Sequence, residues 1–494
     1  MKKIPAVSAY TFKGKALVAV LRGLLTVVRL FRGRRWAAPP PNFSEDPLHF
    51  STRDLLFFAY KYYLKPPEKS ENTEGVENFF LQNPPTFADA KCENETIIGE
   101  LTLTAAGDLM PYEWIQPQFC EHLWDDIADD FFSSDLTFAN LETPIDTARP
   151  PSFVPEVMLS DMNFNGDNKM FEIFTAQNLK PKNQKLNPRF DILSTANNHS
   201  LDMGERGVAA TIAFLEEKNI LFTGTARSEI ERQNFPIIEK NGIRLAFIAY
   251  TFSMNKFLNS ADKPFTVNHL SANRPDVDLS PLRADVALAH ERGADFVVLS
   301  LHFGNAYQAF PGAHIVENAR RIFDECGVDV ILGGHPHNVQ PMASYAFRCP
   351  FSGISKRGFV LFAFGDFVAF DIFNWGHLSV YLKLKVSKYA ENAQNTEWSA
   401  ELKIENYELK KPTTRTVLTS VEAVPVYLNG VYRSKNDRNL RFLTAEKWVS
   451  KLEKGKRPPF MTAWNVRELR ELMRFYWQFF QINHTSKVGD KQIV

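Results

Sequence analysis

Short apolar runs alternate with amphipathic stretches between residues 100 and 385. The runs have the length of buried strands, and most of them end at a polar motif. They occupy residues 101–106, 136–139, 190–195, 243–250, 296–301, 328–332 and 359–364.

Between these runs, apolar residues spaced three or four apart predict helices. Val208, Ile212 and Leu215 would share one face of such a helix, and the apolar positions of residues 315–326 would form another. Gly327 stands where a glycine that ends a helix is expected. Strands that alternate with helices predict an α/β fold with a largely parallel sheet.

The first 35 residues carry nine basic side chains and no acidic one. Lys15, Arg22 and Arg29 are seven residues apart and would line one face of a helix. This pattern predicts a basic amphipathic helix on an anionic membrane surface. A basic helix packed on its own domain is the alternative. Arg22 interrupts the apolar run, which is therefore short for a transmembrane helix of about 20 residues. No clean cleavage site for a signal peptide follows it.

The pattern is weaker on both sides of the alternating region. Residues 55–64 predict a docked helix, and residues 70–83 a polar loop. Beyond residue 385 we expect a loop over 387–399 and short strands over 413–432. The apolar spacing near 466–480 predicts an aromatic helix that packs on the main domain.

A chain of 494 residues is too long for a single ordinary domain. We divide it into a basic N-terminal segment with a proline linker (1–41), a docking region (42–98), a main domain (99–386) and a C-terminal extension (387–494).

Composition excludes some classes of protein. Lys plus Arg and Asp plus Glu both number 57, so the formal net charge is zero. This balance argues against a general nucleic-acid binder, and we expect no nucleic-acid partner. The four cysteines include no pair at CxxC spacing, which offers neither a zinc ribbon nor a redox motif.

Polar residues gather at the ends of the predicted strands. In open α/β sheets the carboxyl ends of parallel strands share one edge, where functional sites form. The motif Gly333-Gly334-His335-Pro336-His337 is one example. Together the strand ends offer Asp108, Glu142, Asn198, His199, His302, His335 and His337.

Carboxylate, amide and imidazole donors suit a divalent transition metal such as Mn²⁺, Fe²⁺ or Zn²⁺. The donors outnumber those that one tetrahedral zinc requires. A pair of ions about 3.5–4 Å apart, bridged by one carboxylate, would use them and would activate a shared water. A nearby histidine would then protonate the leaving group. Asp202 would orient His199 or cap the next helix. Taken singly, Asp108 could be a turn residue, Glu142 a surface charge and His302 a core histidine.

The ordered motifs resemble those of the CapA family, which comprises capsule-synthesis, poly-γ-glutamate-related proteins of the calcineurin-like metallophosphoesterase superfamily. The resemblance covers about residues 100–385 and rests on residues 107–110, 140–142, 197–204, 302–304, 335–341 and 364–368.

This resemblance implies a four-layer α/β sandwich with N- and C-terminal extensions and a centre for one or two metal ions between two sheets. His199 would be the general acid, with Asp202 beside it. The implied metal ligands are Asp108, Glu142, Asn198, His302, His335 and His337.

Three departures from the family pattern affect this expectation. Met110 stands where the superfamily usually has a histidine, two residues after the first aspartate, which implies that one ion is held more weakly. Ala306 replaces a frequent acidic residue, and Asp366 a frequent asparagine. The last two departures affect the expected substrate pocket more than the expected metal ligands.

Three functions remain open at this point. The first is a metal-dependent hydrolase that acts on a γ-glutamyl polymer or a similar cell-envelope substrate. The second is a phosphoesterase whose substrate, polymeric or small, is unidentified. The third is a non-catalytic accessory protein of polymer synthesis or export. We expect membrane association through residues 1–35, on a side of the membrane that the sequence leaves open.

Overall fold

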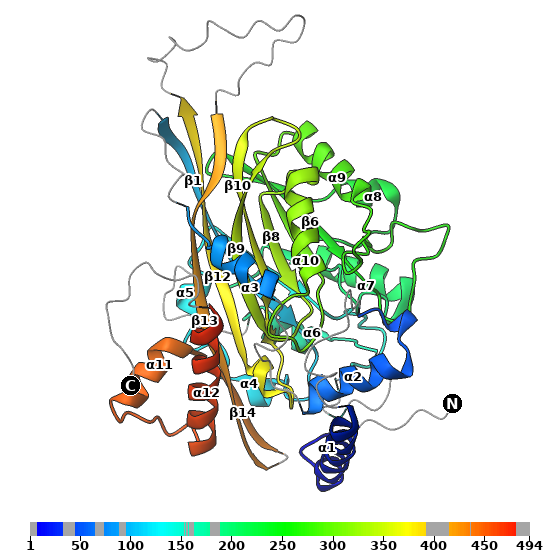
Figure 1. Cartoon of the computed structure of the whole chain (residues 1–494), viewed down its shortest axis with the longest axis vertical. Coiled ribbons are helices and arrows are strands. Elements are labelled where there is room, and N and C mark those ends of the chain that lie inside the picture. Colours follow the sequence, from blue (N-terminus) through cyan, green and yellow to red (C-terminus); the bar gives the residue numbers. More distant parts are fainter. Residues whose placement is uncertain are drawn as a thin grey trace, which may run out of the picture.

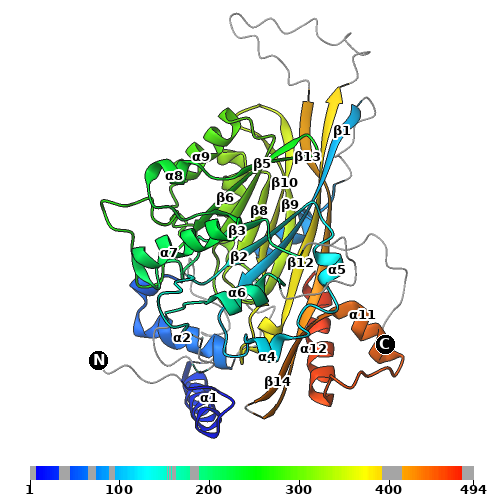
Figure 2. The ribbon, with the colours of Figure 1, turned by 180° about the vertical axis from the view of Figure 1, so that it is seen from behind.

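The computed structural model describes residues 7–32, 45–64, 74–87, 95–152, 154, 157, 163–177, 188–391, 414–434 and 436–480. Two β-sheets pack face to face in these residues, and helices cover their outer faces (Figures 1 and 2). The predicted proline linker at 39–41 lies outside the described residues.

The first sheet has eight strands in the order β14-β13-β12-β1-β2-β3-β4, and β11 pairs with the end of β1. β1 to β4 are parallel to one another, whereas β12, β13 and β14 are antiparallel. The bounds are β1 (Glu95–Leu109), β2 (Leu136–Leu141), β3 (Ile192–Ser194), β4 (Leu221–Thr223), β11 (Asp366–Val368), β12 (Leu378–Glu391), β13 (Thr414–Ser434) and β14 (Asp437–Thr444).

The second sheet has six strands in the order β5-β6-β7-β8-β10-β9. Its four central strands are parallel, as the alternation of strands and helices predicted. The bounds are β5 (Ile237–Lys240), β6 (Ile243–Thr251), β7 (Phe296–His302), β8 (Val330–Gly334), β9 (Val339–Arg348) and β10 (Ser355–Phe364).

Helices lie on the outer face of each sheet, which gives four layers. The core between the sheets includes Phe138 of β2, whose ring stacks on Phe247 of β6 at a centroid distance of 6.2 Å. The next residue of β2, Ala139, faces the opposite way, into a second core with the short helices of the first sheet. Those helices are α4 (Pro117–Cys120), α5 (Ala128–Phe131) and α6 (Asn168–Phe174). The predicted four-layer α/β sandwich is confirmed.

The connecting helices follow the predicted spacing. α7 (Gly204–Glu217) buries Val208, Ile212 and Leu215. α9 (Ser280–Glu291) leads into β7, and α10 (Ala313–Arg321) with the π-helical turn Ile322–Cys326 leads into β8. Gly327 ends this turn at φ 74°, a left-handed conformation that glycine adopts without steric cost.

Several expectations for the extensions are corrected. Within the predicted loop 70–83, residues 74–82 form α3 (Glu74–Gln82), which buries Val76 and Phe80 in the main core. Residues 387–391 are the end of β12, while the rest of the predicted loop lies outside the described residues. In place of short strands over 413–432, one long strand, β13, runs from Thr414 to Ser434.

The other terminal helices agree with their predictions. α2 (Thr52–Tyr63) covers the docked helix expected at 55–64. α12 (Ala463–Phe480) buries Leu469, Leu472 and Met473 in the main core next to α11 (Ala445–Glu453). α1 (Phe12–Arg32) is helical as predicted and lies against α2 at the lower end of the molecule (Figures 1 and 2). Among the described residues, no helix combines the length and apolar character that crossing a bilayer requires.

Candidate metal centre

The predicted site residues meet where strands of both sheets end. Asp108 is the penultimate residue of β1 and Glu142 follows β2, while His302 ends β7 and the pair His335 and His337 follows β8. Asn198, His199 and Asp202 lie in the turn between β3 and α7. All eight side chains are buried, with exposed fractions between 0% for Glu142 and 8% for His199 and His337.

A glycine lets the two sheets approach each other at this point. Gly334 pairs with His302 in the register of β7 and β8. A Cβ atom on Gly334 would lie 2.9 Å from Asp108 Oδ1 and 3.1 Å from His302 Nδ1. A larger residue would therefore push the donors of the two sheets apart.

The first group of donors consists of Asp108, Glu142 and His302, whose ligand atoms lie within 4.8 Å of one another. Asn198 Oδ1 joins them at 3.0 Å from His302 Nε2, and Glu142 Oε1 lies 3.6 Å from the same nitrogen. Burial lowers the pKa of His302 well below its ordinary value, so the imidazole is neutral and keeps a lone pair.

Glu142 is the most unusual member of this group. Neither of its carboxylate oxygens has a hydrogen-bond partner among the described residues. Burial raises the pKa of Glu142 well above its ordinary value, and the charges of Asp108 and Asp366 raise it further. A buried carboxylate beside other carboxylates is costly unless a cation lies among them.

The second group consists of Asp108, His337 and Asp366, again with ligand atoms within 4.8 Å. His337 Nδ1 lies 2.9 Å from Asp366 Oδ1. Burial alone would lower the pKa of His337, but the carboxylates of Asp366 and Asp108 outweigh it and raise the value to about 9. Burial and the charge of Asp366 raise the pKa of Asp108. Asp108 belongs to both groups, which is the position of a bridging ligand.

His199 and Asp202 form a separate pair beside the donors. His199 Nδ1 lies 2.7 Å from Asp202 Oδ2, and the His199 ring stacks on Phe164 at a centroid distance of 3.6 Å. Asp202 Oδ2 also accepts a hydrogen bond from the Phe164 amide at 2.6 Å. The alternative prediction that Asp202 caps the next helix is wrong, because Met203 occupies the N-cap position of α7.

Two carboxylates of this region were missed by sequence reasoning. Asp366 was recognised at a strand end but was not assigned as a ligand. Glu45 lies outside every motif, and its Oε1 is 3.6 Å from His335 Nε2. Burial would raise the pKa of Glu45, but the ammonium group of Lys61 and the imidazole of His335 outweigh it and lower the value. Only contacts in the folded chain reveal this residue.

The residues present fit a divalent metal. The donors are carboxylate oxygens, an amide oxygen and imidazole nitrogens, which suit first-row transition metals. Five of the carboxylate and imidazole donors form two groups that share Asp108, so the centre offers ligands for one or two ions; the predicted ligand His335 belongs to neither group. Glu142 Oε1 and Oε2 and His335 Nδ1 and Nε2 are buried without a hydrogen-bond partner among the described residues, as expected of donors reserved for a cation.

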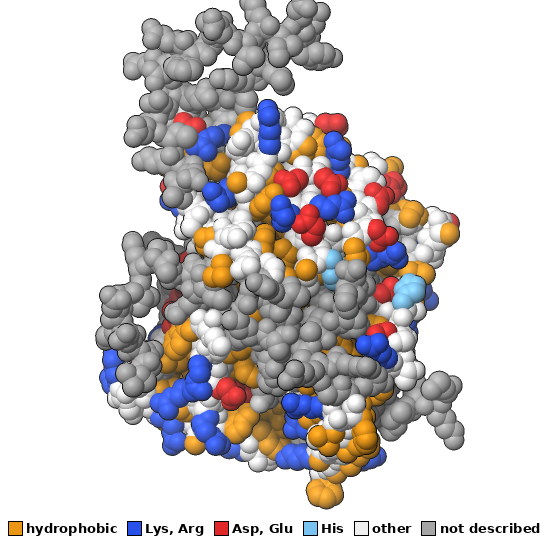
Figure 3. All heavy atoms as spheres, viewed as in Figure 1, with side chains coloured by type: hydrophobic (Ala, Val, Ile, Leu, Met, Phe, Trp, Pro, Cys, Tyr) orange, Lys and Arg blue, Asp and Glu red, His pale blue; other side chains and the backbone are white. Residues whose placement is uncertain are grey.

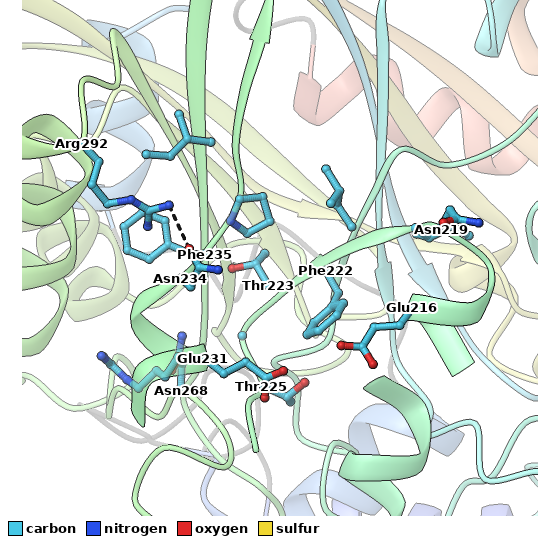
Figure 4. A pocket seen from close by; sticks show the side chains of 16 residues that line it. Glu216, Asn219, Phe222, Thr223, Thr225, Glu231, Asn234, Phe235, Asn268 and Arg292 are labelled. Carbon is cyan, nitrogen blue, oxygen red and sulfur yellow. Dashed lines mark hydrogen bonds between the residues drawn. The ribbon is translucent and has the colours of Figure 1, made fainter. Parts of the chain in front are cut away.

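A cavity larger than the space beside Asp108 and His302 lies elsewhere in the described part of the molecule. It measures about 570 Å³ and lies beside β4 and β5, the edge strands of the two sheets (Figure 4). Phe222, Phe235 and Arg292 are among its lining residues, and none of the predicted metal ligands is. Cavity volume therefore does not identify the metal centre, whose donors are buried between the sheets.

Known proteins share the central part of this chain. Residues 102–371 match the family model described as "Bacterial capsule synthesis protein PGA_cap". The capsule biosynthesis protein CapA of Bacillus anthracis is 26% identical over 283 residues, 56% of this chain and 60% of the relative. The PGA biosynthesis protein CapA of Bacillus subtilis is 24% identical over 250 residues, 50% of this chain and 60% of the relative. The chain thus matches less than two thirds of either relative.

A solved structure is also similar. The calcineurin-like phosphoesterase YfkN of Bacillus subtilis is 14% identical, and the match covers 76% of this chain and 99% of that chain with a TM-score of 0.30. A TM-score of this size supports no inference about chemistry.

Proposed function

Since this chain belongs to the family of bacterial capsule synthesis proteins PGA_cap, we propose that it is a metal-dependent hydrolase in the synthesis or processing of a capsule polymer. Poly-γ-glutamate is the substrate that we favour. The observation that carries the proposal is the pair of buried donor groups that share Asp108.

Each residue has a defined task in this proposal. Asp108, Glu142, Asn198, His302, His335 and His337 would hold Mn²⁺, Fe²⁺ or Zn²⁺, and Asp366 would join them. Bound metal would supply a Lewis acid and an activated water for attack on an amide carbonyl. His199 would donate a proton to the departing nitrogen. Asp202 would orient the imidazole through the 2.7 Å contact with its Nδ1.

The proposal is tested with the full chain and poly-γ-glutamate. After metal removal and reconstitution with Mn²⁺, we expect the polymer to shorten on size-exclusion chromatography and new amino groups to appear. His199→Ala should lower kcat by about 10²–10⁴-fold, the usual contribution of a general acid, while Mn²⁺ binding persists. Full activity in this variant would contradict the assigned role of His199.

The same geometry leaves phosphoester hydrolysis as a second candidate. The histidine–carboxylate pair beside the donors would protonate an alkoxide as readily as an amine. Release of inorganic phosphate from phosphoesters, with no shortening of the polymer, would favour this function. A non-catalytic accessory role predicts that neither product forms and that Asp108→Asn leaves polymer synthesis in cells unchanged.

We further propose that α1 contacts an anionic membrane surface. One side of α1 packs on α2 through Val18 and Leu25. The opposite side exposes an apolar stripe that includes Leu24 at 60% and Phe31 at 87%. α1 has no acidic residue, and its exposed basic residues are Lys13, Lys15, Arg22 and Arg29. The last three lie on the side of α1 nearer α2, where Arg22 Nε donates to the Tyr63 carbonyl at 3.1 Å. Figure 3 shows this apolar surface at the lower end of the molecule, with basic side chains beside it. An exposed apolar stripe on a helix that carries basic side chains and no acidic one favours an interfacial helix.

Co-sedimentation with vesicles tests this contact. We expect binding to vesicles that contain phosphatidylglycerol and weak binding to phosphatidylcholine alone. Leu24→Ser combined with Phe31→Ser should abolish binding, whereas the exposed Leu258→Ser, far from α1 in the sequence, should not. Equal binding by the α1 variant would refute the proposal.

A further inference from the structure

Glu45 lies next to the metal centre although it is outside the family match at residues 102–371. Its side chain is buried, with an exposed fraction of 3%. It belongs to the segment that leads into α2, and α2 lies below the strand ends of both sheets (Figures 1 and 2). The N-terminal region therefore forms one wall of the centre.

The two oxygens of Glu45 have different surroundings. Oε2 accepts hydrogen bonds from Lys61 Nζ at 3.0 Å and from the Ala306 amide at 2.9 Å. Lys61 also donates to the Ala306 carbonyl at 2.7 Å, so this end of the carboxylate is held firmly. Oε1 instead faces His335 Nε2 at 3.6 Å, which is too long for a hydrogen bond.

His335 completes this arrangement from the other side. Its ring lies 5.1 Å from that of His302 and 5.8 Å from that of His337, centroid to centroid, so it lies beside the other donors. Neither ring nitrogen has a hydrogen-bond partner among the described residues. Two donors that bind one ion at about 2.0–2.2 Å lie roughly 3–3.5 Å apart, close to the separation of Glu45 Oε1 and His335 Nε2.

We infer that Glu45 is a metal ligand of this centre, paired with His335 and supplied from outside the family domain. Because it rests on the proposed metal centre, the inference concerns which residues hold the ion and leaves the substrate open. The carboxylate reaches the centre beside Ala306, whose amide donates to Glu45 Oε2.

A purely structural role for Glu45 is the competing explanation, since removal of Glu45 would leave Lys61 buried without its carboxylate. The double variant Glu45→Gln with Lys61→Met separates the two roles, because it removes both charges. Asp329 and Lys356 offer a matched control: they form a buried pair at 2.8 Å, and Asp329 also accepts from the Val297 amide at 2.9 Å. Asp329 precedes β8, whereas the centre lies beyond the end of that strand.

The test measures Mn²⁺ binding by titration calorimetry and thermal unfolding in EDTA. We expect Glu45→Gln to lower the Tm and to weaken Mn²⁺ binding at least about tenfold. The double variant should recover the Tm but keep the weakened binding, and Asp329→Asn with Lys356→Met should bind Mn²⁺ as the wild type does.

Two outcomes would overturn the inference, and they differ. If the wild type binds Mn²⁺ and the double variant binds it equally well, Glu45 is structural and the metal centre stands without it. If the wild type binds no Mn²⁺, Fe²⁺ or Zn²⁺, the proposed centre fails, and the inference fails with it.

Discussion

Glu142 allows a test in which one substitution changes stability in opposite directions with and without metal. In the metal-free protein the ionised form of Glu142 would face Asp108 and Asp366 with no hydrogen-bond partner among the described residues, which costs several kcal/mol unless the carboxylate takes up a proton. Glutamine preserves the shape and removes the charge, although an unsatisfied amide still costs about 1–3 kcal/mol. We therefore expect Glu142→Gln to raise the metal-free unfolding free energy by about 1–3 kcal/mol.

Metal should reverse this order. At a Mn²⁺ concentration of 1,000 times Kd, binding adds about 4.1 kcal/mol to the stability of the wild type, more than the metal-free advantage of the variant. The variant lacks one carboxylate ligand and should lose most of that gain. Calorimetric unfolding in EDTA and in Mn²⁺ measures both differences, and the exposed Glu217→Gln on α7 is the control.

The pH dependence supplies a further check on the same pair of proteins. Burial raises the pKa of Glu142 above its ordinary value, as do Asp108 and Asp366. An acid with a raised pKa binds its proton more tightly in the folded state. Protonation of Glu142 therefore stabilises the folded protein at low pH, and this stabilisation is lost as the pH rises through the raised pKa. The metal-free difference between wild type and variant should shrink toward acidic pH. A variant that is less stable without metal, or that keeps the full Mn²⁺ gain, would refute the reasoning.

Three more predictions follow from packing and hydrogen bonding. Gly334→Ala should weaken Mn²⁺ binding about tenfold or more in calorimetry, because its Cβ would lie 2.9 Å from Asp108 Oδ1; unchanged binding would show that the site adapts. Asp202→Asn should lower kcat about 10–100-fold with Mn²⁺ affinity unchanged, since it disturbs the orientation of His199; an equal loss of metal affinity would contradict this. Phe80→Ala should cost about 3–5 kcal/mol in denaturant unfolding, as expected for a core aromatic, and a loss below 1 kcal/mol would show that α3 is only loosely attached.

The strand ends were predictable because two simple signals coincide there. An apolar run of strand length locates the strand, and the first polar residues after it fall at the shared edge of the sheet. Asp108, Glu142 and His302 were found in this way. Glu45 had no such signal, because its place depends on the docking of α2 through Lys61. No local pattern encodes a contact between residues 45 and 335.

The errors in secondary structure have similar causes. α3 has only nine residues, too few for a stable isolated helix, and it gains its stability by burying Val76 and Phe80 against the main core. β13 contains Pro425 and Gly430, which locally suggest breaks between short strands. The strand continues because β12 pairs with residues 414–427 and β14 with residues 426–434. Tertiary pairing outweighs local preference in both segments.

The position of β1 in the first sheet affects how the chain folds while it is being synthesised. Residues 95–105 of β1 pair with residues 382–391 of β12, nearly three hundred positions later. Until that partner has left the ribosome, one side of β1 presents unpaired backbone groups, which are prone to aggregation. A chain cut at residue 371, where the family match ends, would keep this edge open permanently. We therefore expect such a fragment to be insoluble. A chain that extends through β14 and α12 pairs the open edge of β1 with β12 and covers the core with α12.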